Sequence, residues 1–102
     1  MHVTLIGLGC GDMETITAAA QRALSRAEGI FGSRRLLEGL PPSGAQRVAA
    51  VQPEEIRDHL IHVGWAESCV ILSGDTGFYS GAKRLLPVLA AAGFTTTVLP
   101  GI

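Results

Sequence analysis

The sequence lacks the features that define several large classes of proteins. Its two cysteines, Cys10 and Cys69, are too few for a disulfide scaffold and too isolated for a zinc site. No apolar run approaches the roughly 18 residues of a transmembrane helix, and Met1 leads into a strand-like segment instead of a charged signal peptide. Eight basic and nine acidic residues give a net charge of -1, so neither nucleic acid nor a membrane surface is an expected partner. We expect a cytoplasmic protein that recognises its ligand at a local site.

What the sequence does contain is an alternation of short apolar runs with longer amphipathic segments, separated by many of its 13 glycines. The expected strands are residues 3–8, 30–31, 47–51, 69–72 and 95–99, and the expected helices are residues 15–28, 33–38, 53–63 and 79–92. This order is typical of an α/β domain with right-handed crossovers. It predicts one domain over residues 1–102, with a five-stranded, mostly parallel sheet and helices on both faces.

Several residues predict where the helices begin and end. Asp12 or Thr15 is the expected N-cap of the first helix, and Gly29 is expected to stop it. Ser33 is expected to cap the second helix. Pro53 at a first helical position predicts the start of the third helix, because proline needs no amide hydrogen there.

Two glycine-rich loops follow predicted strands, at residues 7–12 (GLGCGD) and 73–77 (SGDTG). Ligands of parallel sheets bind beyond the carboxyl ends of the strands, so these loops are the candidate binding elements. A dinucleotide fingerprint fits the first loop poorly, because its third glycine would fall at Asp12, whose carboxylate repels a pyrophosphate. Taken singly, each loop is also compatible with a plain turn in which Asp12 or Asp75 caps the next helix.

Together, three segments in order resemble the tetrapyrrole methylase family, the S-adenosylmethionine-dependent enzymes that methylate corrin and porphyrin precursors. They are GLGCGD at residues 7–12, SGDTGFYSG at 73–81 and LPGI at 99–102. The segment FGSRRLLE at 31–38 is similar to the branch that acts on carbon 5 of the ring. That branch comprises the precorrin-6Y C5,15-methyltransferases and the cobalt-precorrin-7 C5-methyltransferases. The resemblance runs along essentially all 102 residues.

The resemblance implies a binding site for S-adenosylmethionine and a tetrapyrrole. The residues implied for the methyl donor are Gly9, Cys10, Ser73, Gly74, Asp75 and Phe78. The residues implied for the substrate are Gly11, Asp12, Ser33, Arg34 and Arg35. Cys10 and Thr76 depart from the family pattern, which has proline at both positions. The resemblance assigns no catalytic acid or base, so the catalytic residues are unassigned.

The resemblance also implies an amino-terminal half, since family members carry a second domain of similar size and hold the donor between the two. The expected function is then C5-methylation of a small-molecule precorrin in cobalamin biosynthesis, by a longer chain of which residues 1–102 are one half. Two alternatives stay open: a non-catalytic fragment or module that forms a homodimer, and a dinucleotide-binding oxidoreductase domain.

Three histidines raise the question of a metal site. His59 and His62 are three residues apart on one expected helix, whereas His2 belongs to another element. No carboxylate is placed near them by spacing, so we expect a solvated helix face and no metal.

Overall fold

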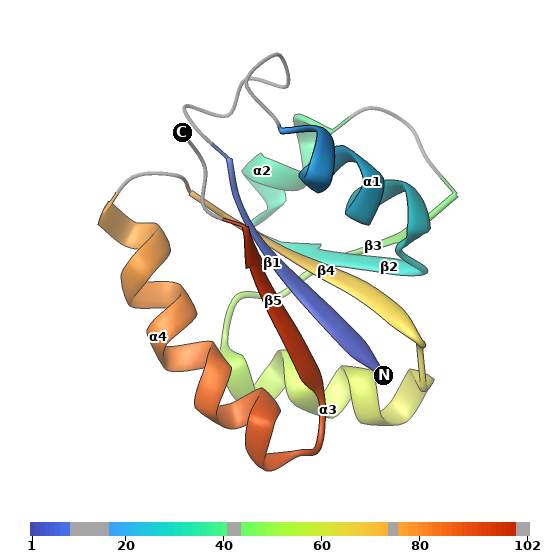
Figure 1. Ribbon diagram of the computed structural model, residues 1–102, viewed down its shortest axis with the longest axis vertical. Coiled ribbons are helices and arrows are strands. Elements are labelled where there is room, and N and C mark those ends of the chain that lie inside the picture. Colours follow the sequence, from blue (N-terminus) through green and yellow to red (C-terminus); the bar gives the residue numbers. More distant parts are fainter. Residues whose placement is uncertain (9–16, 41–43, 74–75, 100–102) are drawn as a thin grey trace.

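The computed structural model describes residues 1–8, 17–40, 44–73 and 76–99. The elements in chain order are β1 His2–Leu8, α1 Ala18–Arg26, β2 Gly29–Gly32, α2 Arg34–Glu38, β3 Gln46–Ala49, α3 Pro53–Val63, β4 Glu67–Ser73, α4 Thr76–Ala91 and β5 Thr95–Leu99. One sheet forms the centre, with α1 and α2 on one face and α3 and α4 on the other (Figure 1). The predicted α/β fold is therefore confirmed, including its five strands.

The strand order is β3-β2-β4-β1-β5, and every neighbouring pair is parallel. The central strands β1 and β4 are continuous apolar runs because helices cover both of their faces. Toward α3 and α4 the sheet presents Val3, Leu5 and Val70, and toward α1 and α2 it presents Ile6, Cys69 and Ile71. Each face has its own hydrophobic core, and β1 and β4 contribute side chains to both cores.

The first helix differs from its prediction at both ends. Its N-cap is Thr17, whose hydroxyl accepts a hydrogen bond from the Ala20 amide at 3.1 Å, so the prediction of Asp12 or Thr15 as cap is wrong. Gly29 does not stop the helix, which ends at Arg26; it is the first residue of β2. A Cβ at Gly29 would lie 2.1 Å from the ring of Trp65, so close packing explains this glycine.

The predicted starts of α2 and α3 are confirmed. The Ser33 hydroxyl accepts a hydrogen bond from the Leu36 amide at 3.3 Å and caps α2. Pro53 begins α3, which ends at Val63 before Gly64 in the left-handed conformation, with φ of 66°. The Ser33 cap and the Pro53 start each act within one helical turn, so the sequence alone predicts where these two helices begin.

The last helix starts earlier than predicted. It begins at Thr76, whereas the sequence predicts Tyr79, so Phe78 lies in the first turn of α4 and not in a loop. Pro87 lies inside α4 without ending it. Within the described parts of the chain, no helix is both long enough and apolar enough to cross a membrane.

Candidate functional site at the carboxyl edge of the sheet

The carboxyl ends of three neighbouring strands define the candidate site. Leu8, the last residue of β1, is the register partner of Ser73, the last residue of β4. On the other side of β1, Ile6 is paired with Leu99 at the end of β5. The three segments that carry the family resemblance therefore leave the sheet from adjacent strands at one edge.

The crossovers after β1 and β4 diverge at this edge. The chain leaving β1 returns through α1 on one face and reaches β2, whereas the chain leaving β4 returns through α4 on the other face and reaches β5 (Figure 1). Such a divergence is a topological switch point, the place in open α/β sheets where ligands bind. The edge between β1 and β4 is thus the place in this fold that suits a small-molecule ligand.

Most of the expected donor and substrate residues belong to the loops at this edge. Six of them lie outside the described residues: Gly9, Cys10, Gly11, Asp12, Gly74 and Asp75. The backbone of Ser73 ends β4 and that of Phe78 lies in the first turn of α4, so both belong to the same edge. The amino end of α4, which carries a positive partial charge, also begins there.

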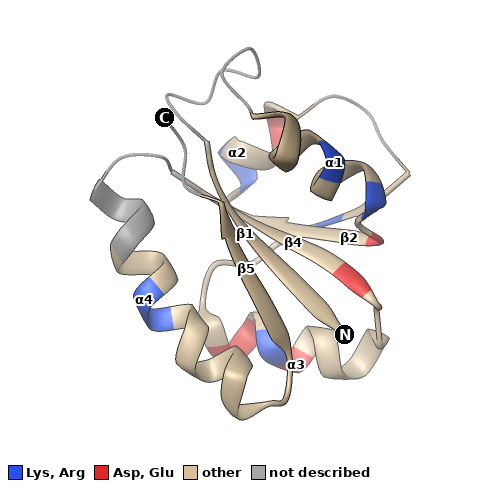
Figure 2. Cartoon of the chain, viewed as in Figure 1, with Lys and Arg blue, Asp and Glu red and all other residues tan. Residues whose placement is uncertain are grey.

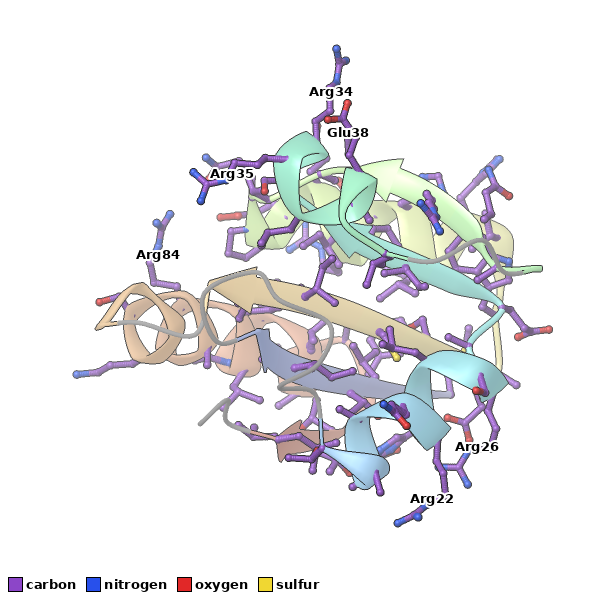
Figure 3. The ribbon with its side chains drawn as sticks, turned by 90° about the horizontal axis from the view of Figure 1, so that it is seen from above. Arg22, Arg26, Arg34, Arg35, Glu38 and Arg84 are labelled. Carbon is purple, nitrogen blue, oxygen red and sulfur yellow. The ribbon has the colours of Figure 1, made fainter. Side chains whose placement is uncertain are left out.

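The second helix begins at the same edge, one strand further along. β2 pairs with β4, and Ser33 follows β2 directly as the cap of α2. Arg34 and Arg35 are exposed, and in Figure 3 both extend outward from α2, with Arg34 beside Glu38. Neither arginine forms an ion pair with any residue that the structure describes. They remain available to an anionic ligand at this edge.

Charged groups are unevenly distributed over the described residues. Acidic groups lie on α3, at Glu54, Glu55 and Asp58, and Glu67 begins β4 (Figure 2). The start of α2 places two arginines beside the carboxyl edge. These two guanidinium groups can contact carboxylates of a ligand there.

His59 corrects one expectation from the sequence. It does not belong to a solvated helix face: it is half-buried, with its ring centroid 5.4 Å from those of both Phe31 and Trp65. Its Nε2 atom is buried and has no hydrogen-bond partner. Among the described residues no three His, Cys, Asp or Glu side chains are grouped to hold a metal ion. Nothing in the spacing of the sequence signals this aromatic cluster, because it joins α3, β2 and the segment before β4.

Cys69 lies in the core beneath α1 and α2 and is 1% exposed. Burial, followed by the negative charge of Glu67, raises the pKa of its thiol to about 12, against a smaller lowering effect of Arg26. The thiolate is the reactive form of cysteine, so Cys69 is a packing residue and not a nucleophile.

The parallel sheet and its switch point define a domain of the doubly wound α/β class. The chain belongs to the Tetrapyrrole (Corrin/Porphyrin) Methylases, whose family model matches residues 2–102. No protein of curated function matches the sequence.

The chain is similar to solved structures of several methyltransferases. The methyltransferase CobJ is 28% identical with a TM-score of 0.81, over 98% of this chain and 46% of CobJ. The precorrin-6Y methylase CbiE of Archaeoglobus fulgidus is 28% identical with a TM-score of 0.72, over 99% and 53%. The uroporphyrin-III C-methyl transferase of Thermus thermophilus, in a complex with S-adenyl homocysteine, is 27% identical with a TM-score of 0.75, over 100% and 45%. The chain thus spans about half the length of the solved structures that it matches.

Proposed function

We propose that this chain is the amino-terminal, donor-binding half of an S-adenosylmethionine-dependent tetrapyrrole C-methyltransferase. Membership of the tetrapyrrole methylases supports the reaction class and favours a methyl donor over a dinucleotide as the ligand of the glycine-rich loops. The observation that carries the proposal is the pairing of Leu8 with Ser73, which sets the last residues of β1 and β4 side by side. The Thermus structure with S-adenyl homocysteine supports the choice of donor.

The chemistry of this edge fits a sulfonium donor. Glycines after β1 and β4 let a ligand approach the main chain, since no Cβ stands in the way. The Asp75 carboxylate suits ribose hydroxyls or an ammonium group, and the amino end of α4 suits a carboxylate. The donor would be held by Gly9, Cys10, Ser73, Gly74, Asp75 and Phe78.

S-adenosylmethionine, when bound, supplies an electrophilic methyl group. The residues of this chain then act by holding and orienting the donor and by excluding water from the site. Orientation of this kind contributes up to about 7–11 kcal/mol in well-aligned reactions, without proton transfer by the protein. A site that only binds and orients the donor needs glycines and single carboxylates, and it needs no catalytic triad.

The substrate that we propose is a precorrin, methylated at carbon 5 in cobalamin biosynthesis. Arg34 and Arg35 are exposed at the start of α2, beside the carboxyl edge of the sheet, and guanidinium groups bind the carboxylates that such a macrocycle carries. Gly11, Asp12 and Ser33 complete the proposed substrate contacts. The choice of carbon 5 rests on the segment 31–38, because CbiE and CobJ are equally identical to this chain, at 28%.

Donor binding is tested by isothermal titration calorimetry with S-adenosylhomocysteine. The protein to use is the complete product of the gene that encodes these residues. Asp75→Asn should weaken binding by about tenfold or more, since it removes a charged acceptor. The matched control is Asp58→Asn, an exposed carboxylate on α3 that pairs with Arg57. Unchanged affinity in Asp75→Asn, or binding of NAD without binding of S-adenosylhomocysteine, would contradict the proposal.

The position of methylation is tested with a donor labelled at its methyl carbon. NMR of the product should show the label on carbon 5 of the precorrin ring. A label on another carbon would agree with methyl transfer to a precorrin but would contradict the proposed methylation at carbon 5. Substitution of Arg35 by glutamine should raise KM for the precorrin more than KM for the donor.

A further inference from the structure

A polar groove lies along the flank of the sheet, between α1 and the edge strand β5. Its volume is about 240 Å³, below the roughly 300–1,000 Å³ of sites for drug-sized ligands. Its polar lining consists of His2, Thr4, Arg22, Arg26, Glu67 and Thr97. A groove of this size and polarity suits a small charged ligand.

The floor of the groove is an ordered network centred on His2. Parallel register pairs His2 with Thr95, so the two side chains share the face of the sheet that carries α1. The Nδ1 atom of His2 lies 2.7 Å from Thr95 Oγ1, and Nε2 lies 2.7 Å from Thr97 Oγ1. The Thr95 hydroxyl also lies 3.3 Å from the carbonyl oxygen of Met1, to which it can donate.

The direction of the hydrogen bond between His2 Nε2 and Thr97 decides what Thr97 offers to the groove. When Nε2 carries a hydrogen, it donates to the Thr97 oxygen, and the hydroxyl hydrogen is free to point at a ligand. His2 in that form gives the groove a hydrogen-bond donor.

The wall of the groove carries two cationic side chains. Arg22 and Arg26 are four residues apart on α1, and both are exposed. In Figure 3 they extend from α1 on the side of the molecule where β5 lies. Neither forms an ion pair with a residue in the described ranges. Glu67 is the one carboxylate in the described lining, so the two arginines outnumber it.

We propose that this groove binds a small oxyanion, such as inorganic phosphate or the phosphate group of a small metabolite. The guanidinium groups of Arg22 and Arg26 would contact the anion from α1, and the Thr97 hydroxyl would donate to it from β5. His2 acts behind Thr97 as a positioning residue. The proposal does not depend on the proposed methyl transfer, because the groove uses none of the residues assigned to it.

The probes are inorganic phosphate and glycerol 3-phosphate, titrated into the protein by calorimetry in low-salt buffer. Arg22→Gln and Thr97→Val should each weaken binding by about tenfold, since each removes one direct contact. The matched controls are Arg84→Gln on α4 and Thr96→Val, the adjacent residue of β5, and both should bind like the parent protein. Tighter binding of the ester would identify a metabolite as the ligand, and equal binding would identify the free ion.

Variants of His2 distinguish this site from general attraction to arginines. His2→Ala should weaken phosphate binding, and His2→Gln, whose amide can still donate to Thr97, should restore part of it. Absence of phosphate binding by the parent protein, or equal weakening in Thr96→Val and Thr97→Val, would overturn the proposal. Circular dichroism of each variant checks that the fold is retained.

Discussion

Replacement of Gly29 by alanine should destabilise the protein strongly, although it adds one methyl group. Gly29 is buried as the first residue of β2, and its Cβ position lies 2.1, 2.3 and 2.6 Å from three atoms of the Trp65 ring. Carbon atoms in contact lie about 3.5–4.0 Å apart, so the ring must move by more than about 1 Å. Three atoms are affected together, so a small tilt of the ring does not relieve the clash.

The neighbours of Trp65 set the cost of that movement. Its ring centroid lies 5.7 Å from that of Phe31 and 5.4 Å from that of His59, and Phe31 is fully buried. Overpacking of a filled core costs about 1–3 kcal/mol. We expect Gly29→Ala to fall at the upper end, at about 3 kcal/mol, because Trp65 must also give up contacts with both neighbouring rings.

Urea denaturation followed by circular dichroism measures this loss as a lower midpoint at an unchanged slope. Gly44→Ala is the control, since a Cβ there meets no atom within 4 Å; it should change stability by less than about 0.5 kcal/mol. In a double-mutant cycle, Gly29→Ala should cost little once Trp65 is alanine. A cost below about 1 kcal/mol in the parent, or the same cost without Trp65, would refute the reasoning.

Two further predictions concern a buried thiol and a helix cap. Burial raises the pKa of Cys69 from the ordinary 9.0 to about 12, so above pH 9 the unfolded chain ionises while the folded thiol keeps its proton. Stability should fall as the pH rises from about 9 toward 12, more steeply than in Cys69→Ala; parallel profiles of the two proteins in urea would contradict this. Thr17→Ala should cost about 1 kcal/mol in thermal or urea unfolding, because the Ala20 amide loses its acceptor. Ser25→Ala on the same helix is the control, and an equal effect of both changes would argue against capping.

The sequence anticipated the parts of the structure that depend on neighbours along the chain. The cap of α2 at Ser33 and the start of α3 at Pro53 follow from signals within one turn of each helix. The five strands also follow, because short apolar runs between amphipathic helices fit a covered parallel sheet. The family resemblance came from the same local segments and is confirmed by the match over residues 2–102.

Other features were misjudged because contacts from elsewhere in the fold decide them. Gly29 looked like a helix stop, but the ring of Trp65 lies against it, and that residue is 36 positions away by number. His59 looked like part of a solvated face, but Phe31 and Trp65 enclose its ring. Helical spacing describes the faces of a helix, and it does not say which neighbour covers each face.

The sequence by itself determined the kinds of elements, their order and the segments that carry the family resemblance. Only the tertiary structure decided that β1 lies between β4 and β5, which sets Leu8 beside Ser73 and His2 beside Thr95. The physical reason is that hydrogen bonding between parallel strands joins residues far apart in the chain, and no local pattern encodes which strands become neighbours. Both the proposed donor site and the proposed anion groove depend on those pairings.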